Sequence, residues 1–200
     1  MNNIDNKQVE ESVDAKRLEA FSDGVIAIVI AIMVLEFKMP EEGTFSALIN
    51  NHLIPVFLAY VLSFTFVGIY WNNHHHLLRA TKNISAGVMW ANLHLLFWIS
   101  LIPAGTIWVG ENYDKSGPAA LYGIIGLLAG IAYYLLVVFI KKANPNSAVA
   151  NAAGNEMKGK LSQLFYALGI ALAFVSPWIS YALYVIVSIM WFIPDKKLFN

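Results

Sequence analysis

The sequence predicts an all-α membrane protein with six transmembrane helices per subunit and both termini in the cytoplasm. Its 200 residues are 58% hydrophobic and only 13% charged, whereas soluble domains average about 45–50% and about 25%. Long apolar runs recur, and about 20 such residues cross a bilayer. Lysine and arginine gather in the segments that would share one side of the membrane, which is typical of the cytoplasmic side.

These apolar runs divide the chain into three regions. We expect a cytoplasmic N-terminal tail at 1–19, a six-helix transmembrane domain at 20–193 and a cytoplasmic C-terminal tail at 194–200. The predicted spans are 20–38, 53–72, 86–109, 118–140, 161–177 and 178–193. Only Ser176-Pro177-Trp178 separates the last two, so they should form a tight helical hairpin.

The basic residues orient these spans. With the N-terminus inside, only Lys38 and Lys115 lie outside. The other eleven of the thirteen basic residues lie on the cytoplasmic side: Lys7, Lys16, Arg17, Arg79, Lys82, Lys141, Lys142, Lys158, Lys160, Lys196 and Lys197. This split is a strong positive-inside signal.

Asp23 is the only carboxylate that falls clearly within a predicted span, and a carboxylate at membrane depth is costly. It is either a proton or cation site or a buried hydrogen-bond anchor for Trp71, Asn72, Asn73 or His75, and we favour the anchor. Arg17 either extends to the headgroups or stacks on Phe21. An Arg17–Asp23 pair within one helix is poor geometry, because six positions separate the side chains by about 240°.

The second and third spans carry polar residues. The second span ends in Trp71-Asn72-Asn73 and the triplet His74-His75-His76. Consecutive helical residues diverge by about 100°, so three histidines in a row do not converge on one ion and we expect no metal site. A pH-responsive anchor is the favoured hypothesis, because imidazole titrates near neutrality; the alternative is interfacial histidines of little effect. Asn92 and His94 in the third span are interpreted as hydrogen-bonding packing residues.

The remaining spans indicate structure rather than chemistry. Gly126 and Gly130 in the fourth span have a small-x-x-x-small spacing, which favours close helix packing within one subunit. The fifth and sixth spans hold no ionisable side chain except tyrosine between Leu161 and Pro194. No nucleophile–base pair or cofactor motif is found, so the sequence predicts neither an enzyme nor a cofactor. Zero net charge without a basic cluster argues against nucleic-acid binding.

Several of these segments together resemble a family of six-helix potassium channels found in prokaryotes and, with the six-helix unit doubled, in endosomes and lysosomes. The resemblance lies in Arg17, Phe21, Ser22 and Asp23 of the first span, in Trp71, Asn73, His74 and His75 after the second, and in Asn92 and Ser100–Pro103 of the third. It implies a structural and gating network made by the first nine of these residues.

The resemblance also implies a pore lined by the first helices of a homotetramer. Family members lack the T-V-G-Y-G filter, and this chain lacks it too. Their hydrophobic constriction corresponds to Ile28, with further narrow layers at Ile32 and Leu35. These three positions lie within about 60° of one another on a helix. Where the family often has a threonine, this chain has Ala31 as the corresponding selectivity position, which favours weak potassium selectivity.

We therefore expect a passive potassium or weakly selective cation channel, with potassium ions, the bilayer and three further copies of the chain as partners. A single six-helix unit indicates a prokaryotic plasma membrane, by resemblance. Two alternatives remain: a proton-coupled transporter that uses Asp23 and His75, and a non-conducting membrane scaffold. Flux that saturates and depends on a pH gradient would indicate the transporter.

Overall fold

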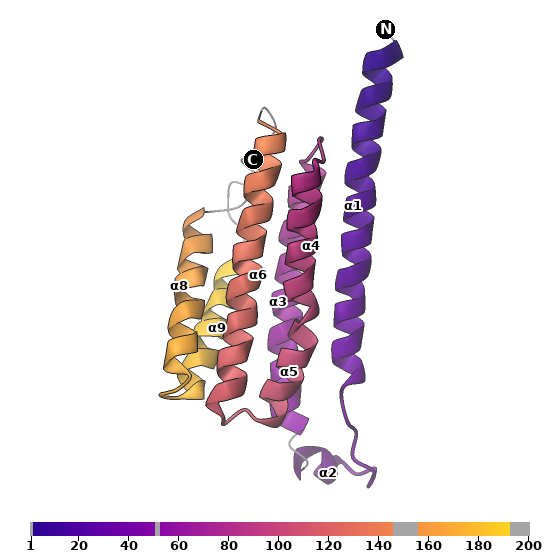
Figure 1. The fold of residues 1–200 in the computed structure, drawn as a ribbon. Helices are drawn as coiled ribbons and strands as arrows, with labels where there is room; N and C mark the ends of the chain where they lie inside the picture. Colours follow the sequence, from indigo (N-terminus) through magenta and orange to yellow (C-terminus); the bar gives the residue numbers. More distant parts are fainter. Residues whose placement is uncertain (1, 51–52, 146–155, 193–200) are drawn as a thin grey trace.

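The computed structural model describes residues 2–50, 53–145 and 156–192, and in these ranges every regular element is a helix (Figure 1). The helices form one bundle, with a short helix beyond one end of it. In chain order they are α1 (Asn2–Leu35), α2 (Phe45–Asn50), α3 (Leu53–Arg79), α4 (Ala86–Ser100), α5 (Ile102–Glu111), α6 (Ser116–Ala143), α8 (Glu156–Leu172) and α9 (Pro177–Phe192).

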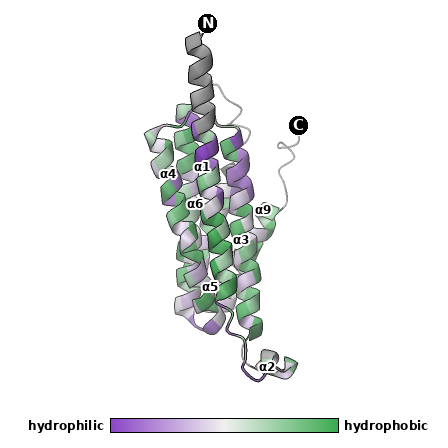
Figure 2. Cartoon of the chain, turned by 90° about the vertical axis from the view of Figure 1, so that its right-hand side faces the viewer, coloured by the Kyte–Doolittle hydropathy of each residue, from purple (hydrophilic) through white to green (hydrophobic). Residues whose placement is uncertain are grey.

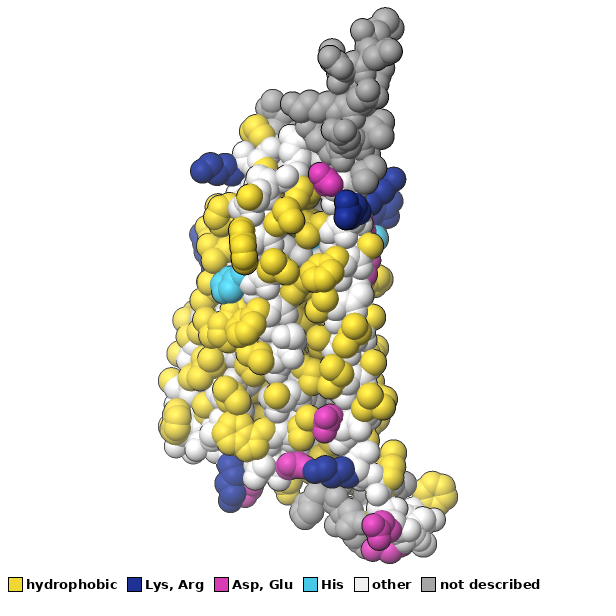
Figure 3. Space-filling view, turned by 45° about the vertical axis from the view of Figure 1, so that its right-hand side comes forward, with side chains coloured by type: hydrophobic (Ala, Val, Ile, Leu, Met, Phe, Trp, Pro, Cys, Tyr) yellow, Lys and Arg dark blue, Asp and Glu magenta, His cyan; other side chains and the backbone are white. Residues whose placement is uncertain are grey.

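Four segments of the described chain are long and apolar enough to cross a membrane. They are Asp14–Leu35, Leu53–Arg79, Ala86–Glu111 and Ser116–Ala143, and Pro177–Phe192 is a shorter apolar helix. Apolar residues cover the middle of the helices (Figure 2), and charged side chains gather toward the two ends of the bundle (Figure 3). The all-helical membrane fold predicted from composition is thus confirmed.

Several helix boundaries differ from the expected spans; α3, for example, continues to Arg79 where the span was expected to end at 72. Helix α1 begins at Asn2, so the segment predicted as a tail continues the first helix. Helix α8 covers Glu156–Leu172, where we expected a span at 161–177, because the chain leaves the helix before the Ser176-Pro177 pair. The predicted tail at 194–200 lies outside the described residues.

The third expected span consists of two consecutive helices. Ser85 caps the start of α4 by accepting a hydrogen bond from the Val88 backbone N–H at 3.3 Å. Leu101 separates α4 from α5, and Pro103 stands in the first turn of α5. A proline lacks the N–H that would continue the α4 ladder, so the helix restarts rather than running straight through.

Helix α1 lies at one edge of the bundle and packs against α3, α4 and α5, while α8 and α9 lie at the opposite edge (Figure 1). Between them the core is built from fully buried aliphatic side chains such as Val67, Leu95 and Leu136. Gly126 of α6 lies directly beneath the Tyr166 ring of α8, where a Cβ atom would clash. The glycine therefore serves packing within one subunit, as we predicted.

Candidate functional site: the two faces of the first helix

Helix α1 has one face inside the subunit and one outside it. Ser22, Ile26 and Val29 are buried against the bundle. Ile28, Ile32 and Leu35 point away from it, with 60%, 41% and 78% of their surface exposed in the single chain. An apolar stripe of this kind faces either lipid or another copy of the chain.

Small residues border this stripe, and of these the sequence pointed only to Ala31. Ala20, Gly24, Ala27 and Ala31 are all exposed and lie within about 60° of one another on the helix surface. A Cβ atom added at Gly24 would meet nothing within 4 Å. Spacings of three and four between small residues let two helix backbones approach closely. This spacing is present in the sequence, but it is hard to recognise among the apolar residues around it.

The inner face of α1 is tied to the bundle by a buried hydrogen-bond chain. Asn92 of α4 donates from Nδ2 to the Ser22 hydroxyl at 2.9 Å, and its Oδ1 lies 2.7 Å from His74 Nε2 of α3. The Ser22 hydroxyl in turn donates to the Leu18 carbonyl at 2.8 Å. All three side chains in this Ser22–Asn92–His74 chain are 0% exposed. One chain of contacts therefore connects α1, α4 and α3.

The direction of these bonds assigns the His74 tautomer. The Asn92 carbonyl oxygen only accepts, so His74 must donate from Nε2. Its Nδ1 is buried and has no hydrogen-bond partner among the described residues. A neutral Nε2–H imidazole is the state that fits a buried site with one acceptor.

A second set of contacts joins α1 and α3 beside this hydrogen-bond chain. Asp23 Oδ1 accepts a hydrogen bond from Trp71 Nε1 at 3.0 Å, and Glu19 Oε1 lies 2.7 Å from His75 Nδ1. The Trp71 and His75 rings stack with centroids 5.8 Å apart. Asp23 thus bonds to one of the four partners that the sequence suggested. Glu19 was missed, although its position four residues before Asp23 places both carboxylates on one face.

The three consecutive histidines face different surroundings, as helix geometry predicted. His74 bonds to Asn92, His75 approaches Glu19, and His76 is exposed. In the described part of the chain, one mixed cluster has metal-ligand chemistry: potential ligand atoms of Glu19, Asp23 and His75 lie within 4.8 Å of one another. A divalent cation could be held by such donors, although the Trp71 bond and the Glu19–His75 contact already occupy two of them.

Three residues of the expected network lie outside these contacts. Phe21 is 51% exposed and stands on the same face as Ile28, since seven positions separate them by about 20°. Asn73 donates to the Ile69 carbonyl of its own helix at 2.8 Å. Arg17 is exposed and makes no ion pair with any described residue. Position within a motif does not by itself fix which face a side chain occupies.

A buried hydroxyl cluster lies behind the other half of α1, and no sequence pattern predicted it. The Thr106 hydroxyl of α5 lies 2.6 Å from that of Ser63 and 2.7 Å from the Ile102 carbonyl, and Ser63 lies 2.9 Å from the Tyr122 hydroxyl. Thr106 also approaches the Met33 sulfur of α1 at 3.9 Å. The cluster positions α5 at the level of Met33 and Ile32.

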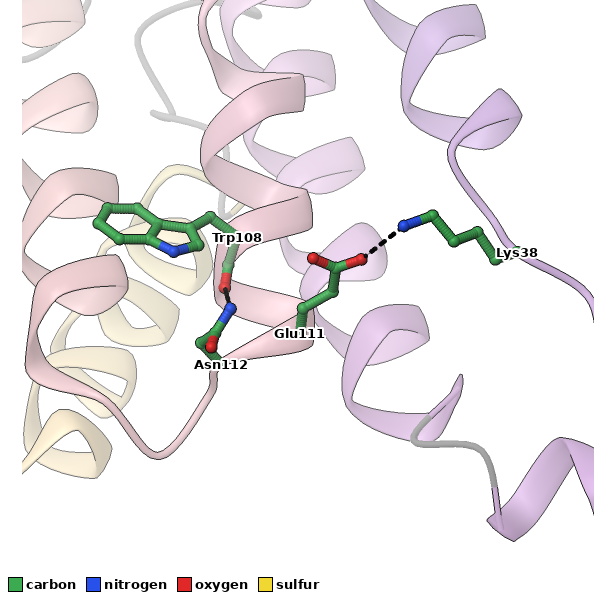
Figure 4. Close-up of polar contacts among 4 residues, drawn as sticks. All are labelled: Lys38, Trp108, Glu111 and Asn112. Carbon is green, nitrogen blue, oxygen red and sulfur yellow. Dashed lines mark hydrogen bonds and ion pairs between the residues drawn. The ribbon is translucent and has the colours of Figure 1, made fainter.

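Lys38, just after α1, forms an ion pair with Glu111 at the end of α5, with Nζ and Oε1 3.0 Å apart (Figure 4). Asn112 beside it donates to the Trp108 carbonyl at 3.3 Å. The hydrogen bond to Glu111, together with the charge of that carboxylate, raises the pKa of Lys38 above its usual 10.5. The pair connects the segment after α1 to the end of α5.

We expect Lys38→Met to change thermal stability very little at neutral pH, because exposed ion pairs contribute little. A raised pKa means that the folded protein binds this proton more tightly than the unfolded chain, so any contribution is complete below the unfolded-state pKa and is lost as the pH rises through the raised pKa of the folded protein. Melting temperatures of the two proteins in detergent should therefore converge between about pH 8 and about pH 11. A difference that widened over this interval would contradict the assignment.

The fold and the site together define a class: an all-helical membrane protein whose first helix is fixed by buried polar contacts on one side and presents an apolar stripe on the other. Residues 17–103 match the family described as the endosomal/lysosomal potassium channel TMEM175. A protein named as a potassium channel from Chryseobacterium sp. (strain P1-3) is 48% identical over 183 residues, which is 91% of this chain and 94% of that protein. The chain belongs to the TMEM175 family.

Two further comparisons agree with this membership. A protein named as a potassium channel from Streptomyces collinus (strain DSM 40733 / Tue 365) is 30% identical over 82% of this chain and 84% of that protein. The crystal structure described as a lysosomal potassium-selective channel TMEM175 homolog from Chamaesiphon minutus superposes with a TM-score of 0.78 and 26% identity, covering 90% of this chain and 96% of that chain. The family resemblance found in the sequence is confirmed.

Proposed function

We propose that this protein is a potassium channel of the bacterial plasma membrane, through which ions move passively along a pore lined by α1 of four identical subunits. The observation that carries the proposal is the division of α1 into an anchored face and an exposed apolar face. The relatives named as potassium channels give the ion. Membership in this family of ion channels argues against an enzymatic role.

The proposed topology has six spans with both termini in the cytoplasm. Helices α1, α3 and α6 are single spans, α4 and α5 together make another, and α8 and α9 complete the set. The last two are shorter, so neighbouring parts of the protein and local thinning of the bilayer would accommodate them. The distribution of lysine and arginine supports this orientation.

In this arrangement Ile28 forms the narrowest ring, followed by Ile32 and Leu35. Water leaves a narrow apolar neck, and an ion then meets a desolvation barrier until the ring widens. Ala31 offers no hydroxyl to a passing ion, and selectivity for potassium over sodium is therefore modest. The Ser22–Asn92–His74 chain and the Asp23–Trp71 bond hold the opposite face of the helix and fix the position of the ring.

The exposed small residues of α1 support a subunit interface beside the pore. Ala27→Leu should disrupt the tetramer, because the added bulk separates helices that need close approach. Size-exclusion chromatography with light scattering would show a smaller species. Ala167→Leu on α8 is the matched control, since this alanine is also exposed but lies at the opposite edge of the bundle. Equal assembly of both variants would exclude this face as the interface.

Flux in liposomes tests the function directly. The purified protein should conduct potassium down its gradient and conduct sodium more slowly. The potassium flux should not saturate over a wide range of ion concentrations. The proton-coupled alternative predicts saturating flux that requires a pH gradient and disappears in Asp23→Asn with the fold intact. Absence of any ion flux from correctly assembled protein would favour the scaffold. Single-channel recording in a planar bilayer distinguishes the three outcomes most sharply.

A further inference from the structure

A cavity of about 510 Å³ lies between α3, α6, α8 and α9, and no residue of α1 lines it. Its inner wall is aromatic, with Phe66, Tyr70 and Tyr166 among the lining side chains. At the end where α6 finishes and α8 begins, Lys141 and Lys160 line it. Sites of this volume that are mostly apolar with a few polar groups are typical of small amphiphilic ligands.

The charged side chains that line the cavity are all positive among the described residues. Two lysines contribute to the lining, and no aspartate or glutamate does so among the described residues. The lysines belong to the basic end of the bundle, which also carries Arg79, Lys82 and Lys142. Basic pockets between transmembrane helices at this side of a membrane bind anionic lipid headgroups.

The inner part of the cavity has an unused polar group. Tyr166 is 2% exposed, and its hydroxyl has no hydrogen-bond partner among the described residues. A buried hydroxyl without a partner is costly, and a ligand oxygen reaching the cavity would satisfy it. Ester and glycerol oxygens of a phospholipid lie between its headgroup and its acyl chains, where such a donor could meet them.

One glycine leaves the wall open. A Cβ atom at Gly130 would have only the Tyr70 hydroxyl within 4 Å, at 3.7 Å, whereas at Gly126 it would clash with Tyr166. The cavity is therefore not filled by the subunit's own side chains at Gly130, while one turn away the helices are closely packed. A cavity within the bilayer that opens between helices is accessible to lipid.

We propose that this cavity binds one anionic phospholipid, with its phosphate on Lys141 and Lys160 and an acyl chain against the aromatic wall. The site is separate from the proposed pore, and binding does not depend on conduction. A bound lipid would connect α8 and α9, at the edge of the bundle opposite α1, to α3 and α6.

Native mass spectrometry of the full-length protein, after exchange into mixed phosphatidylglycerol and phosphatidylcholine, tests the proposal. Phosphatidylglycerol should remain bound to the wild type after phosphatidylcholine has left. The double variant Lys141→Gln/Lys160→Gln should bind phosphatidylglycerol about thirtyfold more weakly, since each basic residue near a membrane contributes about a fivefold preference for anionic lipid. Lys142→Gln is the matched control, because Lys142 is exposed and does not line the cavity.

Gly130→Leu gives a second, independent test, since its side chain would occupy the cavity without removing charge. It should lose phosphatidylglycerol binding, and added phosphatidylglycerol should raise the melting temperature of the wild type but not that of this variant. Three results would each overturn the proposal. The wild type could retain both lipids equally, Lys142→Gln could lose as much phosphatidylglycerol binding as the double lysine variant, or correctly folded Gly130→Leu could bind phosphatidylglycerol fully. Displacement by glycerol phosphate alone would overturn the role of the acyl chain.

Discussion

Replacing Ile28 with asparagine is expected to raise potassium flux about tenfold or more, the factor given by removing about 1.4 kcal/mol of barrier. The side chain is 60% exposed on the single chain and would face three copies of itself around the pore axis. A ring of amides offers hydrogen bonds to water and ions, so the neck stays hydrated. Ile28→Ala should also change flux, because it widens the neck while leaving it apolar. Potassium uptake by liposomes of known protein content measures both effects.

The matched control is Ile189→Asn on α9. Ile189 is 56% exposed, so the same chemical change is made at similar accessibility on the opposite edge of the bundle. This variant should conduct like the wild type. Unchanged flux in both Ile28 variants would remove Ile28 as the gate, and the layers at Ile32 and Leu35 would then be the next positions to substitute.

Asn92→Leu is expected to reduce the free energy of unfolding by about 1–3 kcal/mol. Leucine has the same branching and the same number of side-chain heavy atoms as asparagine, so the shape is largely kept while two hydrogen-bond partners are lost. The Nε2–H group of His74 would have no acceptor and the Ser22 hydroxyl would lose its donor, all within a site that is 0% exposed. Reversible unfolding in detergent by denaturant titration measures the change.

Asn73→Leu is the matched control for this substitution. Asn73 is half-buried and bonds to a carbonyl of its own helix, so its loss should change the free energy of unfolding much less. If the two variants were equally stable, the Ser22–Asn92–His74 chain would not be the anchor of α1. A double-mutant cycle with Ser22→Ala would then show no coupling, whereas we expect the two effects to be non-additive.

The residues that the sequence motif groups together are divided by the structure. Ser22, Asp23, Trp71, His74, His75 and Asn92 make contacts among α1, α3 and α4. Phe21 instead shares the exposed face of Ile28, although it stands next to Ser22. Successive helical positions are about 100° apart, so the sequence predicted the divergence of the residues. Which face each residue met depended on where α3 and α4 packed.

Other features could not be predicted because they need contacts between distant segments. The Thr106–Ser63–Tyr122 cluster joins α5, α3 and α6, and each residue alone is a common polar residue in an apolar helix. Glu19 falls in the segment expected to be the N-terminal tail, and only the approach of His75 gave it a partner. The cavity beside Gly130 likewise results from how four helices pack, and no local pattern encodes it.

The sequence by itself determined the membrane class, which follows from composition and the length of the apolar runs. Helical periodicity placed Ile28, Ile32 and Leu35 on one face of a helix, and the motif residues indicated the family by resemblance. Only the tertiary structure decided that this stripe stays exposed while the opposite face of α1 is fixed by Ser22 and Asn92. In an apolar helix almost every face can be buried, so the choice depends on which neighbours supply the buried polar partners.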